Sequence, residues 1–509
     1  MNLGEWVTKR AELYPGRPFL KAGALSLTNV DFSKRMHATA ASLAKRGVGK
    51  GDRVAALMEN GAAFLDLFFA CARLGAILVP VNPHLTIEEI DHILVDSEPL
   101  LVLHSLSHTE VVRGLAFHSQ APGRAVPHDE AAGKNPVGLL ADDGTLGRAD
   151  AASVQSPPEA NDPLILMYTS GTTGRPKGAL LTHRNFLFGA IHSLLAYGLG
   201  PRCRSLVVAP LFHIGALAAS VTPVVYAGGS LVLEAFERPA DTLQTLVEEQ
   251  ITYMFAVPVM FEMMARSGRW ETADFSHVDF FIAGGAPMPV DLIHRYQDEK
   301  GVAFAQGYGM TETLRITNLD LADAHTKAGS IGKAAFHTEV RLVDDEGREV
   351  PAGQPGEIMV KGPTVFGGYW RQPAATDQVL RNGWFSTGDL ARRDEAGFLY
   401  IVGRKNDVII CSGKNIYAAE VEQALRRLSA VSAAAVVGRP DKRRGEIPEA
   451  FVELAEVPGT TTGADLIALL GPHLAEYKLP RRIHVVDRLP RGKSGKILKN
   501  ALKERSANV

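Results

Sequence analysis

The sequence predicts an α/β protein with a large N-terminal domain, built on doubly wound parallel sheets with subdomains, and a small α+β C-terminal domain. Three observations carry this prediction. Strand and helix patterns alternate over residues 30–105, a chain of 509 residues is too long for one core, and a separate strand–helix pattern follows residue 406. Alternating β and α segments favour parallel strands joined by crossovers. We expect domains at 1–405 and 406–509.

The segment from 30 to 105 carries the clearest alternation. Apolar β-rich runs bounded by glycine and proline predict strands, and apolar residues at helical spacing predict the helix between them. A Thr-x-x-Glu capping box opens the next helix. The predicted elements are strand Arg53–Met58, helix Phe64–Leu74, strand Ile77–Val81, the capping box Thr86–Glu89 and strand Leu100–Leu103.

Beyond residue 105 the pattern fades and then returns. Residues 120–160 are rich in Pro, Gly, Ala and Asp and indicate a variable surface connection. Ser205–Leu233 has no Asp, Glu, Lys or Arg, but its prolines and glycine pair favour a buried helix and strand over a membrane span. The later predicted elements are strands Leu164–Tyr168, Val408–Ile410, Ala433–Val437 and Ile483–Val486, and helices Ala418–Leu428 and Ala464–Leu470.

Composition excludes several classes of function. The 54 basic and 56 acidic residues give a net charge of −2, so nucleic acid is not an expected partner. Three widely spaced cysteines, Cys71, Cys203 and Cys411, form neither a disulfide framework nor a zinc pattern. The charged segment Met1–Leu20 has no apolar signal region. We expect a cytoplasmic protein, with peripheral membrane contact and oligomeric state left open.

A run of glycines and hydroxyl side chains follows the strand Leu164–Tyr168. Glycines let backbone N–H groups approach phosphate oxygens, hydroxyls add donors and a lysine adds charge. The common P-loop is excluded because Arg175 and Pro176 follow the last glycine of the loop, and because Gly492–Ser494 lacks the earlier glycine. The residues expected to hold the phosphates are Thr169, Ser170, Gly171, Thr172, Thr173, Gly174 and Lys177.

This loop resembles the signature of the adenylate-forming superfamily, which includes acyl-CoA synthetases, peptide-synthetase adenylation domains and firefly-type luciferases. Further motifs follow in the superfamily's order, so the resemblance covers about residues 20–505. It implies ATP and Mg²⁺ as reaction components, an acyl-adenylate intermediate and a mobile C-terminal domain. The motifs are 169–178, 284–287, 307–313, 386–389, 403–407 and 492–496.

The resemblance assigns the nucleotide-binding residues. Tyr308, flanked by glycines including Gly309, is expected against the purine, and Thr311 is expected to donate to the α-phosphate. Glu312 offers hard oxygen ligands and is the expected Mg²⁺ ligand. Asp389 is expected at the ribose hydroxyls and Arg404 at the ribose or phosphate. The backbone at the adenine edge is expected from Gly284, Gly285 and Ala286.

The resemblance also assigns the two half-reactions. Lys496 is the expected cation between the acid's carboxylate and the α-phosphate, where two negative groups meet. Asn406 is expected at the pivot of the C-terminal domain, although the superfamily usually has Asp or Lys there. Gly413 and Lys414 lie in the segment expected to line the pantetheine channel of coenzyme A, with Lys414 replacing the commoner Gly.

The segment around His213 indicates which carboxylic acid is the substrate. His213 itself is expected to gate the thiol or contact the carboxylate. No Asp or Glu lies between Leu206 and Leu233, so no partner for a substrate ammonium is offered there. The sequence favours a medium- or long-chain fatty acid, with aryl acids left open. Residues expected to leave room for the acid are Gly215, Ala216, Val257, Val259 and Gly285.

Four functions are compared. An acyl-CoA ligase is favoured. A stand-alone adenylating enzyme that loads a carrier protein, or an aryl-CoA ligase, are the alternatives. A non-catalytic nucleotide-binding relative would be expected to lack Lys496 or Glu312, and both are present.

Overall fold

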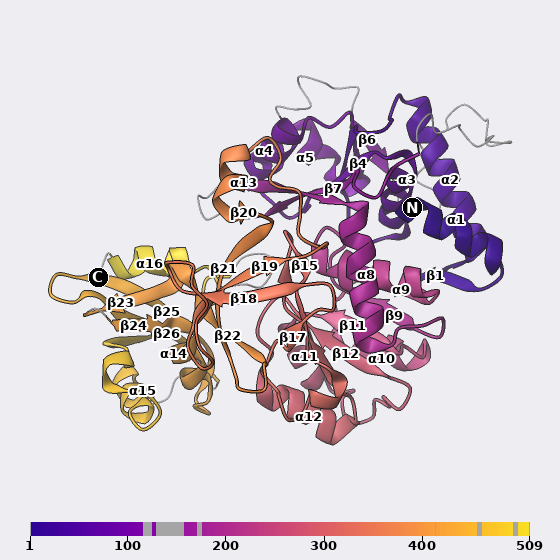
Figure 1. Cartoon of the computed structure of the whole chain (residues 1–509). Helices are drawn as coiled ribbons and strands as arrows, with labels where there is room; N and C mark the ends of the chain where they lie inside the picture. The colour runs from indigo at the N-terminus through magenta and orange to yellow at the C-terminus, as the bar shows by residue number, and fades with distance from the viewer. Residues whose placement is uncertain are drawn as a thin grey trace. The chain divides into compact units, whose positions relative to one another are not determined.

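The computed structural model describes residues 2–115, 125–128, 157–169, 176–412, 414–455, 461–491 and 497–507. The chain forms two compact units (Figure 1). Unit 1 comprises Met1–Val340 and Val360–Phe385, and unit 2 comprises Arg341–Met359 and Ser386–Val509. The predicted boundary at 405/406 falls within unit 2 and stays a prediction.

The first sheet of unit 1 has seven strands in the order β13–β12–β11–β9–β10–β1–β2. All neighbours are parallel except β1 and β2, which form a hairpin. Crossovers between parallel strands bring every carboxyl end except that of β2 to the same edge. The strands are β1 (Pro18–Ala22), β2 (Leu25–Thr28), β9 (Arg204–Val207), β10 (Ser230–Leu233), β11 (Tyr253–Ala256), β12 (Phe280–Ala283) and β13 (Phe304–Gln306).

The second sheet of unit 1 has six strands in the order β6–β5–β3–β4–β7–β8, parallel except for β8. The doubly wound parallel prediction is thus confirmed. The predicted capping box is present, because Thr86 accepts from the Glu89 backbone and Glu89 accepts in return. The elements are β3 (Arg53–Leu57), β4 (Ile77–Pro80), β5 (Leu101–Ser105), β6 (Ala125–His128), β7 (Pro163–Thr169), β8 (Lys177–Thr182), α3 (Ala62–Leu74) and α4 (Ile87–Ser97).

One apolar core joins the two sheets of unit 1, since it contains Ile165 of the second sheet and Phe255 of the first. Helix α8 lies against α9 and strand β15 in this core (Figure 1). Ser205–Leu233 contains β9, η3, α9 and β10, as the prediction of a buried helix and strand requires. The remaining main elements of unit 1 are α1 (Leu3–Leu13), α2 (Asn29–Lys45), α5 (Thr109–Arg113), α8 (His183–Tyr197), π-helix η3 (Ala216–Val221), α9 (Thr222–Ala227), α10 (Pro239–Glu248), α11 (Pro258–Ala265), α12 (Val290–Lys300), β14 (Gly309–Met310), β15 (Leu314–Arg315), β16 (Thr317–Asn318), β17 (Lys333–Ala334), α13 (Pro373–Val379) and β20 (Leu380–Arg381).

Unit 2 contains an α+β fold. Strands β24, β23, β26 and β25 form an antiparallel sheet, and β27 joins β26 in parallel. Strand β21 pairs with β22 in a further sheet that includes β18 and β19. The elements are β18 (Glu339–Val343), β19 (Gly356–Lys361), β21 (Trp384–Arg393), β22 (Leu399–Arg404), β23 (Val408–Cys411), β24 (Lys414–Tyr417), α14 (Ala418–Arg426), β25 (Val431–Asp441), β26 (Gly445–Leu454), α15 (Gly463–Leu470), β27 (Arg482–Val485) and α16 (Lys499–Ala507).

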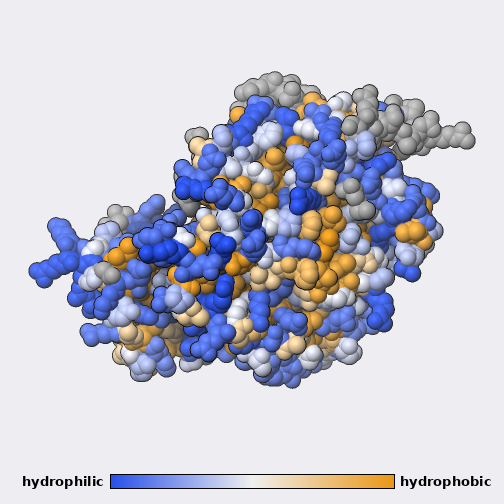
Figure 2. Space-filling model, in the orientation of Figure 1, coloured by the Kyte–Doolittle hydropathy of each residue, from blue (hydrophilic) through white to orange (hydrophobic). Residues whose placement is uncertain are grey.

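The surface mixes charged and apolar residues. Hydrophobic residues gather over the region of α8 in Figure 2, and Leu195 of this helix is exposed. Within the described parts of the chain, no helix has both the length and the apolar character needed to cross a bilayer.

Candidate active site

The motif segments of unit 1 meet at one edge of the first sheet. Pro210–His213 comes soon after β9, Val257 after β11, Gly284–Ala286 after β12, and Gly307–Tyr308 after β13. These four strands are parallel neighbours, so their carboxyl ends share an edge. The Gly284 N–H donates to the Ala256 carbonyl at 3.3 Å, which joins two of the segments directly. Open parallel sheets bind ligands at this edge.

A tight hairpin presents Thr311 and Glu312. Strands β14 and β15 pair Gly309 with Arg315 and Met310 with Leu314. A Cβ on Gly309 would lie 1.7 Å from the Leu314 carbonyl oxygen, so only glycine permits this pairing. Leu314 itself adopts a left-handed φ of 52°, which the pairing imposes on a non-glycine residue.

Replacing Gly309 with alanine is expected to open this hairpin and destabilise the protein by about 2–3 kcal/mol, because backbone atoms cannot move aside as a flexible side chain would. Thermal unfolding measures the effect. Gly200→Ala is the matched control, because a Cβ there meets no atom within 4 Å. An unfolding temperature equal to that of the control would contradict the steric account.

Glu312 is a buried carboxylate held by neutral partners. Its side chain is 6% exposed. Its Oε1 accepts from the Thr169 hydroxyl at 3.3 Å and from the Tyr369 hydroxyl at 3.0 Å. Burial and the nearby Glu312 charge raise the pKa of Tyr369, so this phenol stays protonated and donates. In the described part of the chain, Glu312 forms no ion pair with a lysine or arginine.

This environment fits a divalent cation carried by a nucleotide. A buried anion without a counter-charge is costly, and a hard carboxylate oxygen suits Mg²⁺. The described residues contain no cluster of three or more His, Cys, Asp or Glu able to hold a metal ion. A metal that is bound mainly by ATP phosphates and water needs only one carboxylate from the protein.

The phosphate loop is framed by the ends of β7 and β8. Thr169 pairs with Lys177 in this antiparallel pair, and the Lys177 Nζ lies 5.4 Å from the centre of the Tyr369 ring. Tyr369 was not among the residues predicted from the sequence. Its backbone forms an antiparallel β-bridge with Ala179 of β8, which holds it in this position. Thr169 and Lys177 thus lie near the Glu312 site. The other predicted loop residues, Ser170, Gly171, Thr172, Thr173 and Gly174, lie outside the described residues.

The adenine-edge residues occupy turns at the same sheet edge. The Tyr308 backbone is fully engaged, because its N–H donates to the Thr317 hydroxyl at 3.2 Å and its carbonyl accepts from the Ile316 N–H at 2.8 Å. Gly285 has a φ of 80°, which favours glycine, and both Gly285 and Ala286 are exposed. The predicted roles of these residues in nucleotide binding stay predictions.

The segment that carries His213 is clamped by Asn60, a residue absent from the sequence-based list. The Asn60 amide donates to the Ala209 carbonyl at 3.0 Å, and its oxygen accepts from the Leu211 N–H at 2.7 Å. Asn60 follows β3, so the second sheet positions this segment. Desolvation lowers the pKa of His213, which therefore carries a neutral imidazole at neutral pH.

Phe255 occupies space that the small residues were expected to leave open. A Cβ on Gly215 would lie 2.8 Å from the Phe255 ring, and one on Gly284 would lie 2.6 Å from it. Both glycines therefore accommodate an aromatic side chain. Val259 is 46% exposed on α11, and Ala216 is completely buried. These contacts leave less space for the acid substrate near Gly215 than the sequence predicted.

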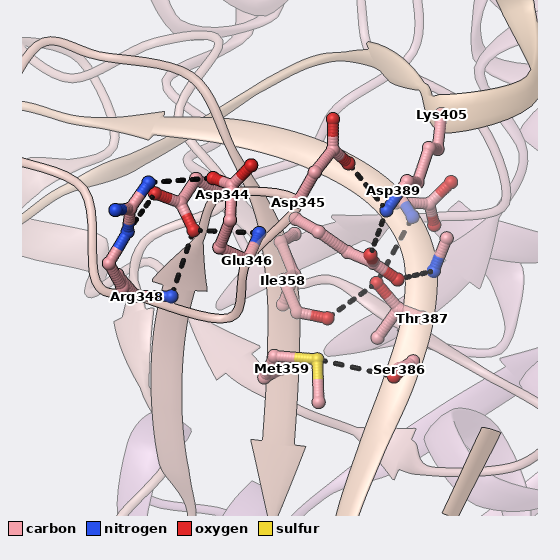
Figure 3. Close-up of polar contacts among 12 residues, drawn as sticks. Asp344, Asp345, Glu346, Arg348, Ile358, Met359, Ser386, Thr387, Asp389 and Lys405 are labelled. Carbon is pink, nitrogen blue, oxygen red and sulfur yellow. Dashed lines mark hydrogen bonds and ion pairs between the residues drawn. The ribbon is translucent and has the colours of Figure 1, made fainter. Parts of the chain in front are cut away.

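In unit 2, Asp389 and Arg404 lie together. The Arg404 Nε is 3.0 Å from the Asp389 Oδ1, across the β21–β22 pair. Asp389 is 6% exposed, and its N–H donates to the Thr387 hydroxyl at 3.1 Å, which in turn donates to the Ile358 carbonyl at 2.9 Å (Figure 3). The two residues that the sequence assigned to one site are therefore in direct contact. Their roles at the ribose stay predictions.

A second ion cluster in unit 2 flanks the predicted pivot, Asn406. The Lys405 Nζ lies 2.9 Å from the Asp345 Oδ1 and 3.1 Å from the Glu357 Oε2 (Figure 3). These carboxylates raise the pKa of Lys405. The Glu357 Oε1 also accepts from the Gly388 N–H at 3.2 Å, which links this cluster to the turn before Asp389.

Asp389→Ala is expected to weaken ATP binding about ten- to a hundredfold, the usual loss for hydrogen bonds to a charged group. Calorimetric titration with ATP measures it. Asp345→Ala is the control, because Asp345 pairs with the neighbouring Lys405 but its side chain is 83% exposed. Equal ATP affinity in wild type and Asp389→Ala would contradict the ribose assignment.

The remaining predicted residues of unit 2 are only partly described. Lys414, on β24, is exposed, and its Nζ lies 4.7 Å from the centre of the Tyr477 ring. Gly413 and Lys496 lie outside the described residues. The residues that flank the 492–496 segment are paired, because Arg491 and Ile497 form an antiparallel bridge and the Leu498 N–H donates to the Pro490 carbonyl at 2.8 Å.

Comparison with known proteins decides the family. Residues 7–370 match the model of AMP-binding enzymes, and residues 420–496 match that of the AMP-binding enzyme C-terminal domain. The chain belongs to the AMP-binding enzyme family. The predicted adenylate-forming superfamily, the fold class and the assignment as an AMP-forming acid–thiol ligase are confirmed.

Individual members of this AMP-binding family match over nearly their full length. A feruloyl-CoA synthase of Amycolatopsis sp is 41% identical over 505 residues, 99% of each chain. A long-chain-fatty-acid–CoA ligase of Mycobacterium tuberculosis is 33% identical over 515 residues, 100% of this chain and 99% of the relative. The structure of o-succinylbenzoate coenzyme A synthetase from Bacillus subtilis, in complex with ATP and magnesium ion, matches at TM-score 0.86 with 32% identity, covering 99% of each chain.

Proposed function

We propose that this enzyme is an aryl-carboxylate–CoA ligase that uses ATP and Mg²⁺. The observation that carries the choice of acid is the 41% identity to a feruloyl-CoA synthase, against 33% to a long-chain-fatty-acid–CoA ligase. The medium- or long-chain fatty acid favoured by the sequence therefore has less support than the aryl alternative.

The packing of Phe255 supports the same choice. Its ring lies against the backbone of Gly215 and of Gly284, between two segments that follow the sheet edge. Because this buried ring takes up room beside Gly215, the space left suits a flat aryl ring better than a long alkyl chain, which needs an extended channel. Coenzyme A is the proposed thiol, with Lys414 and the Gly413 segment on its pantetheine path.

In the first half-reaction, a carboxylate oxygen of the acid forms a bond to the α-phosphorus of ATP, and the bond to pyrophosphate breaks. Thr311 donates to the α-phosphate, and Lys496 supplies the positive charge that offsets the two negative groups as charge develops. Glu312 would hold the Mg²⁺ that accompanies ATP, and the metal would supply charge neutralisation on the phosphate oxygens. Asp389 and Arg404 hold the ribose, and Tyr308 lies against the adenine.

In the second half-reaction, the thiol sulfur of coenzyme A bonds to the acyl carbon, AMP leaves with the bonding oxygen, and the thiol proton passes to solvent. His213 stays neutral because desolvation lowers its pKa. It therefore lies beside the carbonyl of the acyl-adenylate without a positive charge. Such a charge would attract the AMP anion and slow its departure.

Acyl-CoA formation across a panel of acids tests this proposal. We expect kcat/KM for a hydroxycinnamic acid to exceed that for octanoate or palmitate by at least about tenfold, a ratio that one or two pocket contacts supply. A higher kcat/KM for either fatty acid would contradict the aryl assignment. Pyrophosphate release that is unaffected by coenzyme A would contradict the choice of thiol.

A further inference from the structure

A half-buried cation lies on the hairpin that carries Glu312. Arg315 ends strand β15, opposite Gly309, and is partly exposed. It forms no ion pair with a carboxylate among the residues that the structure describes. An arginine removed from water without an acidic partner is costly, so an acceptor from a ligand would stabilise it.

The known contacts of Arg315 are all neutral. Its Nη1 donates to the Asn318 Oδ1 at 3.3 Å, and its guanidinium carbon lies 4.8 Å from the centre of the Tyr197 ring. Tyr197 also donates to the Asn318 Oδ1, at 3.4 Å. The Arg315 side chain also hydrogen-bonds the buried Tyr253 hydroxyl. A guanidinium has five N–H donors, so these contacts leave capacity for a ligand oxygen.

Two titratable groups lie near this cluster: Asp320, whose charge contributes to the raised pKa of Tyr197, and His192. Burial, His337 and Arg315 lower the pKa of His192 to about 4, so its imidazole is neutral at neutral pH. His192 is 1% exposed, and its Nε2 accepts from the His337 N–H at 3.4 Å. Among the described residues neither group forms an ion pair with Arg315, so its guanidinium favours an acceptor over a second cation.

The cluster borders the edge where the acid is expected. A Cβ on Gly307 would lie 3.7 Å from the Tyr197 hydroxyl and 3.9 Å from the Arg315 Cδ. Gly307 follows β13 and precedes the proposed adenine contact Tyr308. Arg315 is three positions after Glu312 in the chain, which limits their backbone separation to about 10 Å. An aromatic ring with a short carboxylate-bearing side chain spans a distance of this order.

We propose that Arg315 is a specificity-determining residue that binds an oxygen acceptor at the ring end of the aryl acid, opposite the reacting carboxylate. Asn318 and Tyr197 orient the guanidinium for this contact. The ligand chemistry is a ring-borne oxygen, either of a hydroxyl or methoxy group or of a second carboxylate. This inference rests on the proposed aryl-CoA ligase function and narrows its substrate class.

The test compares wild type, Arg315→Met and Arg315→Lys on cinnamate and on its 4-hydroxy, 4-methoxy and 4-carboxy derivatives. We expect wild type to prefer at least one oxygen-bearing acid, and the kcat/KM ratio over cinnamate to fall about ten- to a hundredfold in Arg315→Met. The KM for ATP and the rate with cinnamate should stay essentially unchanged. In Arg315→Lys, the kcat/KM ratio over cinnamate should be retained best for the 4-carboxy acid. A lysine still supplies a point charge, which attracts a carboxylate more than a neutral oxygen.

The control variant is Arg204→Met, which removes a partly buried arginine that already pairs with Glu249. Its acid ratio should match that of wild type even where its unfolding temperature falls. An equal loss on cinnamate and on the oxygen-bearing acids in Arg315→Met would mean a purely structural arginine and would overturn the inference. Formation of aryl-CoA esters with an unchanged ratio would overturn it while leaving the proposed function intact. Failure of wild type with every aryl acid would overturn both.

Discussion

The Lys496→Ala variant is expected to form acyl-adenylate about a hundred- to a thousandfold more slowly than wild type, the usual loss when one preorganised donor to a developing charge is removed. Without the ammonium, the carboxylate and the α-phosphate repel each other as their bond forms. The second half-reaction should stay largely intact, because attack by the thiol on a neutral acyl carbon needs no such cation. Single-turnover assays of the two half-reactions measure this split, with acyl-adenylate supplied for the second.

Lys493→Ala is the matched control, since it removes a lysine of the same Gly492–Lys496 segment. It should change neither rate substantially. Loss of both half-reactions to the same extent in Lys496→Ala would contradict the assigned role and indicate a lysine needed for folding or for nucleotide binding in general.

Glu312→Gln is expected to lower adenylation at least about a hundredfold and to raise the Mg²⁺ concentration needed for half-maximal rate. The amide keeps the shape of the carboxylate, and its oxygen can still accept from Thr169 and Tyr369. What it removes is the negative charge that draws the cation. Pyrophosphate release measured across a Mg²⁺ titration reports the change.

Glu234→Gln provides the control for charge removal in unit 1. Glu234 also accepts from two hydroxyls, those of Thr242 and Thr245, and among the described residues its side chain forms no hydrogen bond to the proposed site. It should leave the Mg²⁺ dependence unchanged. An unaltered Mg²⁺ dependence in Glu312→Gln would show that the metal is held elsewhere.

Local signals in the sequence predicted the regular part of unit 1 well. Buried parallel strands such as Ile77–Pro80 are short apolar runs flanked by proline and glycine, and the Thr86 capping box is a local hydrogen-bond pattern. Such features depend on neighbours along the chain. The chain's matches to the AMP-binding family extend these predictions to the whole fold.

Strand β26 shows where local signals fail. Its first five residues, Gly445–Glu449, include two glutamates and Pro448, a composition that argues against a strand inside a sheet. The structure accommodates this by tertiary contacts: Glu449 is 2% exposed and its Oε1 lies 2.9 Å from the His484 Nε2 of β27. Pairing between distant segments is invisible in a single sequence.

The site itself was predicted through its motifs and missed where support comes from elsewhere in the chain. Tyr369 contacts Glu312 from 57 residues away, and Asn60 clamps the His213 segment from 149 and 151 residues away. Neither residue stands in a recognisable pattern. Phe255 lies in an ordinary apolar strand, so its packing against Gly215 could be found only from the fold.

The central claim is that an acyl-adenylate forms before any thiol is needed. Exchange of labelled pyrophosphate into ATP, measured with Mg²⁺ and an aryl acid in the absence of coenzyme A, tests it most directly. We predict exchange that depends on the acid and falls about a hundred- to a thousandfold in Lys496→Ala. Absence of exchange without coenzyme A, together with ADP and phosphate as products when coenzyme A is added, would contradict the account.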